Sequence, residues 1–502
     1  MGRPVDPAFT SLPLAALADA ALTRARELGV DHADLRVERI RTGDVVLHDA
    51  RLETSHDDDE HGLAVRVVHN GSWGFAGGVV LTPAAAVGLA EEAVEIARAC
   101  HPVATERVEL AAEPACGDGT WVSSYDVDPF DVPMSDRIAL LTDWSQRLLA
   151  SATVRHADAR LRHVRENKFY ADTAGTMTTQ QRVRLQCQLT GIWVDDESGR
   201  FESMRTLAAP VGRGWEWLTG DLHDWDGELA ELPELLAEKA AAPSVEAGRY
   251  DLVVDPSNLW LTIHESIGHA TELDRALGYE ANYAGTSFAT PDKLGTLRYG
   301  SPGMHVTGDR QAEHGLATIG WDDEGVAAQT WDLVRDGTLV GYQLDRRIAA
   351  ATGAGRSNGC AFADSPLHVP IQRMANVSLQ PVAGGPSTEE LIAGVDNGIF
   401  IVGDKSWSID MQRYNFQFTG QRFYRIRGGA LDGMLRDVAY QATTTDFWGS
   451  MDAVGGPQTY VLGGAMNCGK GQPGQTAPVS HGCPAARFRD VRILNTLTEA
   501  GS

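Results

Sequence analysis

Three residues in the stretch HESIGH, namely His264, Glu265 and His269, are of the types that hold and use a catalytic metal. In the common zinc motif H-E-x-x-H, two histidines one helical turn apart bind the ion, and the glutamate between them is the general base. Here the second histidine comes one residue later. A metal can still bridge the pair if the imidazoles lean inward, or if a π-bulge widens the helix, which Gly268 would tolerate. Both geometries leave Glu265 facing the ion.

The segment that must position these residues has the signals of one continuous helix, from Asp255 to Leu277. Asp255 is a good N-cap and Pro256 suits the first helical position. At about 100° per residue, the apolar side chains share one face of this helix. Both histidines lie on the opposite, polar face with Glu265 and Glu272. The alternative interpretation is that the two histidines are merely solvated on that face.

Two histidines leave a tetrahedral site one protein ligand short if water takes the fourth position. Cys468 is the best candidate, because it lies in a Gly-rich loop beside Lys470, whose charge favours the thiolate that binds metal. Glu272 competes with it, and Cys483 and His481 remain open alternatives.

A separate acidic group, Asp322, Asp323 and Glu324, is a possible cation site. The stretch D-D-E-G followed by strand-like residues is, however, more typical of a turn. We therefore interpret these three residues as part of a turn.

The elements along the chain predict an α+β fold with two domains. Residues 1–245 form a mixed α/β domain with an antiparallel sheet, because strand and helix patterns alternate there. The strand patterns lie near 33–40, 43–53 and 63–78, with Asn70-Gly71 as a hairpin turn, and the helix patterns near 81–99, 135–150 and 228–240. Residues 241–248 are the expected linker. Residues 246–502 are rich in glycine and strand patterns, which favours a barrel-like catalytic domain that carries the metal-site helix.

The composition excludes several classes of function. The 502 residues include 68 Asp and Glu against 43 Lys and Arg, which gives a net charge of −25. This charge repels phosphate backbones and anionic lipids, so neither nucleic acid nor a membrane is an expected partner. The N-terminus is typical of an amphipathic helix and not of a signal peptide. The six cysteines have no framework spacing, so we expect a cytoplasmic protein with reduced thiols.

Five blocks of the chain resemble those of the TldD/PmbA family. HESIGHATELD (264–274) is similar to the family's H-E-x-x-x-H-x-x-E-x-D block. The others are GLAVRVVHNGSWGFA (62–76), GWDDEG (320–325), GRSNGCAFADSPLHVPIQRMANVSL (355–379) and CGKGQP (468–473). Five blocks in the family's order, over nearly the whole chain, are far more specific than any single motif.

The resemblance implies a TldD-type metallopeptidase subunit, the metal-bearing member of a pair whose other member, TldE or PmbA, lacks the H-E-x-x-x-H block. Carried over to this chain, the metal ligands are His264, His269 and Cys468, and the general base is Glu265. The implied cofactor is one zinc ion per catalytic subunit, with another divalent metal as the alternative. The implied partners are a TldE/PmbA-type subunit and unfolded or extended peptides, including modified-peptide precursors.

On this hypothesis Glu265 takes a proton from metal-activated water and passes it to the leaving amine. An extended peptide would add as a strand along a sheet edge of the second domain. Two rivals remain open: a deformylase-like amide hydrolase that uses the same residue types, and a non-catalytic peptide-binding or scaffold subunit. Bound metal and turnover together would separate these three functions.

Overall fold

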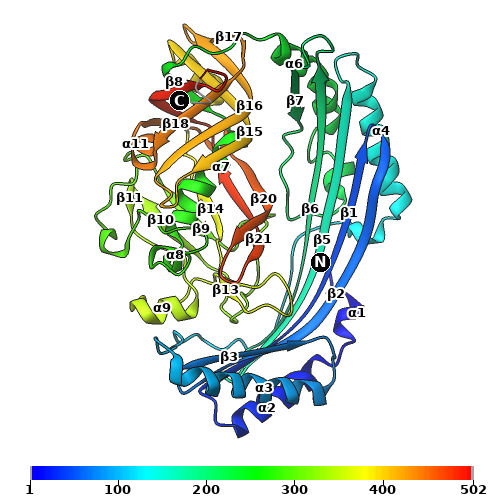
Figure 1. Cartoon of the computed structure of the whole chain (residues 1–502), viewed down its shortest axis with the longest axis vertical. Coiled ribbons are helices and arrows are strands. Elements are labelled where there is room, and N and C mark those ends of the chain that lie inside the picture. Colours follow the sequence, from blue (N-terminus) through cyan, green and yellow to red (C-terminus); the bar gives the residue numbers. More distant parts are fainter. Residues whose placement is uncertain (1–2, 499–502) are drawn as a thin grey trace.

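The computed structural model describes residues 3–498, and the first half of the chain is built around one long sheet (Figure 1). The strand order is β3-β2-β1-β5-β6-β4, with β7 paired to β6. The strands are β1 (His32–His48), β2 (Arg51–His69), β3 (Ser72–Gly78), β4 (Gly119–Val122), β5 (His156–Asp172), β6 (Met177–Val194) and β7 (Phe201–Arg205). β4 runs parallel to β6, and the other pairs are antiparallel. The predicted antiparallel sheet is therefore confirmed.

The predicted hairpin turn between β2 and β3 is also confirmed. Asn70 and Gly71 have φ angles of 51° and 73°, as a two-residue type I′ turn requires. Along β1 and β2 the side chains alternate between the two faces of the sheet. Leu35 and Val65 enter an apolar core, whereas the buried Arg36 and Arg66 contact residues of the second half of the chain.

Helices cover the outer face of this sheet at its two ends (Figure 1). α2 (Leu14–Glu27) and α3 (Pro83–Cys100) share a core with β1, β2 and β3. α4 (Met134–Leu149) and α6 (Trp225–Ala241) share a second core with β1, β5 and β6. α3 begins where the sequence predicts it, because the Thr82 side chain accepts the Ala85 N–H and Pro83 occupies the first turn.

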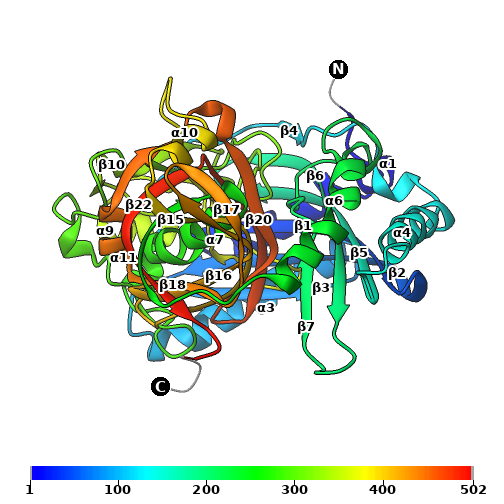
Figure 2. The ribbon, with the colours of Figure 1, turned by 90° about the horizontal axis from the view of Figure 1, so that it is seen from above.

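The second half of the chain contains a closed barrel of five strands. β15 (Asn397–Ile409), β8 (Gly248–Val254), β22 (Ala486–Asn495), β18 (Val438–Thr443) and β16 (Asn415–Arg427) follow one another, and β16 pairs back to β15. β17 (Ala430–Leu435) extends β16, and β19 (Met451–Val454) extends β22. Viewed from above, these strands surround α7 (Pro256–Ile263), whose Asn258 side chain bonds to the backbone of β15 and β16 (Figure 2). The predicted α+β fold with a barrel-like second part is confirmed.

Smaller elements complete the two halves of the chain. The strands are β9 (Val306–Asp309), β10 (Thr330–Arg335), β11 (Thr338–Leu339), β12 (Ala361–Phe362), β13 (Ile371–Gln372), β14 (Asn376–Leu379), β20 (Val461–Lys470) and β21 (Gln475–Cys483). The helices are α1 (Pro7–Thr10), α5 (Glu216–Thr219), α8 (Leu273–Ala276), α9 (Arg346–Thr352), α10 (Thr388–Ala393) and α11 (Thr444–Gly449). β20 and β21 form a two-stranded sheet beside α7.

The segment expected to be the linker, residues 241–248, runs from α6 to β8 against the barrel. The Val245 N–H donates to the carbonyl of Arg436 at 3.0 Å, and the Val245 side chain is buried. The connection is therefore packed and not a free tether. The domain boundary between residues 245 and 246 stays a prediction.

The contact of α3 with β3 generates a stability prediction. A Cβ at Gly74 would lie 1.8 Å from the carbonyl oxygen of Ala93, so Gly74→Ala must push the helix away from the sheet. We expect a loss of about 1–3 kcal/mol in the free energy of unfolding. Gly88→Ala, in the exposed face of the same helix with no atom within 4 Å, is the control and should stabilise by about 0.5–1 kcal/mol. Urea denaturation of both variants measures this, and equal effects would contradict the packing argument.

Candidate metal centre

The helix that carries the HESIGH stretch is broken, and the prediction of one continuous helix from residue 255 to 277 was wrong. α7 begins at its Asp255 cap and ends at Ile263. A π-helical turn then covers His264–Gly268, in which the His269 N–H bonds to the His264 carbonyl. A 3-10 turn (His269–Thr271) and α8 follow. The π-turn is one of the two geometries that the sequence left open, and its extra residue brings the two imidazole centroids to 4.7 Å.

Polar side chains form hydrogen bonds with the backbone groups that lack helical partners where the helix is interrupted. The Gln343 side chain donates to the Gly268 carbonyl at 2.7 Å and accepts the Ala375 N–H at 2.8 Å. The Thr271 hydroxyl donates to the Ile267 carbonyl at 2.8 Å. Because a buried carbonyl without a partner is costly, these bonds allow the helix to break inside the protein.

The polar face predicted for this helix is buried. Each of His264, Glu265, His269 and Cys468 is at most 5% exposed. The interpretation of two solvated histidines is therefore wrong, since the barrel, β14 and the β20–β21 pair enclose both faces of the segment. Gly268 lies in the π-turn, as expected, and a Cβ there would also lie 2.5 Å from the Met374 sulfur, so that side chain would have to shift.

The structure brings together three of the residues singled out in the sequence. Ligand atoms of His264, His269 and Cys468 all lie within 4.8 Å of one another, and His269 Nε2 is 3.5 Å from Cys468 Sγ. Cys468 reaches the helix from β20, next to an irregularity in its pairing with β21. The three atoms that converge are two imidazole nitrogens and one sulfur.

A chain of hydrogen bonds orients His264. His481 Nδ1 lies 2.8 Å from the Val377 carbonyl, which can only accept, so this nitrogen carries a proton. His481 Nε2 is then the acceptor for His264 Nδ1–H at 2.7 Å. Burial lowers the pKa of His481 well below its usual value, which keeps the ring neutral. His264 Nε2 is left with a free lone pair, and His481 lies behind His264 and outside the convergent set.

A carboxylate orients His269 in the same way. His269 Nδ1 lies 2.8 Å from Glu272 Oε2, which leaves His269 Nε2 free. Burial opposes ionisation of Glu272, but Lys470 and the His269 hydrogen bond hold the pKa of its carboxyl well below the usual value. Glu272, a competing ligand candidate from sequence, therefore lies behind His269.

The charge of Lys470 favours the Cys468 thiolate, as the sequence suggested, but less than that of Arg373, and Lys470 has a second role. Its ammonium group pairs with Glu272 at 3.0 Å and with Asp274 at 2.8 Å, so it neutralises buried carboxylates. Burial raises the pKa of the Cys468 thiol to about 11, and Arg373 is the main charge opposing this shift. A metal that binds Cys468 at neutral pH would therefore displace a proton. Cys483, the other cysteine candidate, contacts the Pro256 carbonyl at 3.7 Å through its thiol.

Glu265 pairs with Arg413, a residue that no sequence signal had singled out. Arg413 lies in the connection between β15 and β16, about 150 residues along the chain from the helix. Burial, followed by the charge of Arg413, lowers the pKa of His269 well below its usual value. Arg413 is thus close to both the expected base and an expected ligand. The sequence also did not single out Arg373 or Gln343, although Arg373 lies in the block at residues 355–379 that resembles the family.

The acidic stretch at residues 322–325 is a turn, in agreement with the interpretation from sequence. One Asp322 carboxylate oxygen accepts the N–H groups of Glu324 and Val326, both at 2.9 Å. Asp323 pairs with Lys168 at 2.7 Å and Glu324 pairs with Arg66 at 2.8 Å. These carboxylates therefore join the turn to the long sheet of the first half.

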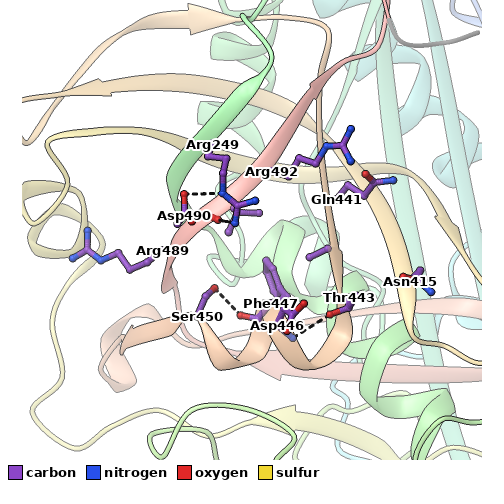
Figure 3. Close-up of a pocket in the computed structure, with 12 residues that line it drawn as sticks. Arg249, Asn415, Gln441, Thr443, Asp446, Phe447, Ser450, Arg489, Asp490 and Arg492 are labelled. Atoms are coloured by element: carbon purple, nitrogen blue, oxygen red, sulfur yellow. Dashed lines mark hydrogen bonds and ion pairs between the residues drawn. The ribbon is translucent and has the colours of Figure 1, made fainter. Parts of the chain in front are cut away.

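Two other features contain none of the predicted site residues. A pocket of about 580 Å³ on the barrel is lined by Arg249, Arg489, Arg492 and polar side chains (Figure 3). Arg249 is paired there with Asp490 at 2.8 Å. A group at the β1–β2 tip, His48, Asp49 and His156, is partly exposed, and each imidazole Nδ1 is already bonded to an aspartate.

The convergent donors fit zinc. Two nitrogens and one sulfur are ligands that zinc prefers, and three protein ligands leave the open position of a catalytic site. Each histidine is oriented by a hydrogen bond to its other ring nitrogen, as is usual for metal-binding histidines.

Within residues 3–498, no helix is long and apolar enough to cross a membrane.

Two family models match the chain. The PmbA/TldA metallopeptidase C-terminal domain matches residues 247–495, and PmbA/TldA metallopeptidase domain 1 matches residues 33–97. A metalloprotease of Methanothermobacter thermautotrophicus is 27% identical, over 93% of this chain and 96% of its own length. A zinc metalloprotease TldD homolog of Saccharolobus solfataricus is 22% identical, over 94% and 98%.

A solved structure shares the fold. TldE from Thermococcus kodakarensis superimposes with a TM-score of 0.68 at 14% identity, over 94% of this chain and 98% of its own. The matches to the family models and the metalloproteases extend over both halves of the chain and include the helix of the convergent site. The chain belongs to the TldD/PmbA family, whose domains are those of the PmbA/TldA metallopeptidases.

Proposed function

We propose that the chain is the catalytic subunit of a zinc-dependent peptidase of the TldD type. One zinc ion would be held by His264 Nε2, His269 Nε2 and Cys468 Sγ. The observation that carries this proposal is the convergence of these three buried atoms, with both imidazoles oriented from behind. The names of the relatives, metalloprotease and zinc metalloprotease, support the same reading.

The chemistry that we propose divides between the ion and Glu265. A bound zinc would supply Lewis acidity, which polarises a peptide carbonyl and acidifies water. Glu265 takes a proton from the attacking water and delivers it to the leaving amine nitrogen. Its carboxylate is buried and paired with Arg413, and its charge acts on His264 and Cys468 of the convergent set.

An extended peptide is the substrate that the surroundings of the site favour. In the described chain β20 pairs with β21 alone, so its other edge has N–H and C=O groups available to a peptide strand. This edge borders a cleft of about 230 Å³ that Gln186 and Gln188 of β6 line from the opposite side. Trp260 and residues 463–467 line the near side, directly before Cys468. Backbone pairing along β20 would accept many sequences and lead them to the site.

The assembly and compartment are part of the same proposal. We expect a heterodimer with a TldE/PmbA-type subunit, on the resemblance of the H-E-x-x-x-H block, and unfolded peptides or modified-peptide precursors as substrates. We place the enzyme in the cytoplasm, because all six cysteines are unpaired, as in a reducing compartment.

Replacing the proposed base tests the function directly. Glu265→Gln keeps the shape of the side chain but removes its basicity, so we expect zinc content to stay near that of the wild type and turnover to fall by about 10²–10⁴-fold. The assay is zinc analysis and cleavage of an unstructured peptide pool, with and without a co-expressed TldE-type partner. A well-folded wild type without zinc would contradict the ligand assignment. Zinc without cleavage in either assembly would favour the scaffold rival, and release of formate alone the deformylase rival.

The second prediction concerns the group behind His264. The rings of His481 and Trp260 are stacked, with 11° between their planes, and His481→Phe keeps a ring there. The variant removes the acceptor for His264 Nδ1–H. We expect zinc affinity to fall by about 10–100-fold. His305→Phe, at a partly exposed histidine paired with Asp332, is the control and should not change it. Competition with a chromogenic chelator measures both, and an unchanged affinity for His481→Phe would show that the hydrogen bond does not orient the ligand.

A further inference from the structure

Arg413 is held in an unfavourable backbone conformation next to Glu265. Its φ is 63°, in the left-handed region that glycine adopts freely and other residues adopt at a cost. The residue lies in the tight connection between β15 and β16, where a glycine would meet the backbone requirement better. A strained residue that persists at a candidate active site points to a role for its side chain.

The connection that carries Arg413 is fixed from several sides. The Asp410 carboxylate accepts the N–H groups of Gln412 at 3.0 Å and Tyr414 at 2.8 Å. The Arg413 carbonyl accepts the Thr444 hydroxyl at 2.8 Å. The carbonyl of Met411 accepts the Thr286 N–H at 2.8 Å. These bonds fix the backbone of the connection, so the guanidinium is preorganised next to Glu265.

The guanidinium has donors to spare. One terminal nitrogen, Nη1, donates to Glu265, and the side chain is only 13% exposed. Its Nε is buried and makes no hydrogen bond within residues 3–498. A planar cation with five N–H groups, one of them committed to the expected base, can offer others to an oxygen that arrives beside that base.

We propose that Arg413 is a further catalytic residue, which stabilises the negative charge on the oxygen of the scissile carbonyl. The inference rests on the proposed peptidase function. In the hydrolysis, water oxygen adds to the carbonyl carbon and the carbonyl oxygen takes up the π electron pair. Glu265 carries one water proton to the amine nitrogen as the C–N bond breaks. The guanidinium, held next to Glu265, stabilises the negative charge that forms on the carbonyl oxygen at the first of these steps. In a buried site such an interaction is strong.

The test uses the strain to separate catalysis from structure. Arg413→Gly removes the side chain and suits the left-handed backbone, but it also leaves buried Glu265 without its cationic partner, so the melting temperature should fall modestly while the zinc site stays intact. We expect zinc content and KM to change little and kcat to fall by about 10²–10³-fold. The kcat of Arg413→Lys, which keeps the charge without the planar fork, should lie between the values of the wild type and Arg413→Gly. Asp336→Gly, at an exposed hairpin residue that also has a positive φ (48°), is the control and should keep full activity.

A binding measurement on the zinc-loaded protein supplies an independent readout. A phosphinic peptide carries a tetrahedral anionic group in place of the scissile amide, so it resembles the charged species that Arg413 would contact. Its affinity should fall in Arg413→Gly by about the same factor as kcat, while affinity for the cleaved peptide products stays unchanged.

Three outcomes with Arg413→Gly would overturn the inference by itself. Retained kcat in Arg413→Gly would show that the guanidinium does not act on the reaction, and loss of zinc in this variant would show a structural role at the metal site. A rise in KM for peptides with a free C-terminus but not for amidated peptides would assign Arg413 to a substrate carboxylate. A wild type that binds zinc but cleaves nothing would instead refute the peptidase function, and this inference with it.

Discussion

The geometry of the site depends on one backbone irregularity, the π-helical turn from His264 to Gly268. In a regular α-helix, residues five apart point in directions about 140° apart. The wider turn returns His269 to the side of His264, and its N–H reaches the His264 carbonyl five residues back. The break that follows at Glu272 places a carboxylate behind His269. In this structure the turn brings the imidazole pair together, and the break after it places Glu272 within hydrogen-bond distance of His269.

Burial of so many charged groups explains why distant segments meet at this turn. Unpaired charges inside a protein are costly, so each carboxylate near the site has a cationic partner. Lys470 from β20 and Arg275 from α8 neutralise Glu272 and Glu280, and Arg413 neutralises Glu265. Lys470 and Arg413 come from β20 and from the connection between β15 and β16, so the folded second half is required before the site exists.

The two halves of the chain contribute differently to function. The second half supplies every atom of the convergent set, whereas the long sheet supplies the opposite wall of the cleft through Gln186 and Gln188. Buried ion pairs, Lys168 with Asp323 and Arg66 with Glu324, hold the halves against each other. Arg205 and Asp404 form another pair at the cleft, 2.6 Å apart. A peptide on β20 would therefore lie between walls whose spacing these pairs set.

The sequence by itself determined the features that depend on near neighbours. The alternation in β1 and β2, the Asn70-Gly71 turn and the Thr82 cap of α3 are local, so the residue pattern was enough to predict them. The ordered blocks identified the family, and residue types pointed to His264, His269 and a third ligand. The residue types favoured Cys468 as this third ligand and the resemblance implied it, but local spacing left Glu272, Cys483 and His481 as open alternatives. It also left a solvated helix face as an alternative, because periodicity describes one helix and not what packs around it.

Only the tertiary structure decided how these candidates are arranged. His481 lies behind His264 and Glu272 behind His269, while Cys468 reaches the two free nitrogens. Lys470 pairs with carboxylates that no local pattern links to it, and Arg413 reaches Glu265 from a connection between barrel strands. The physical reason is common to all of them. Contacts between segments 100–200 residues apart depend on strand register, barrel closure and the pairing of buried charges, and none of these is encoded in local spacing.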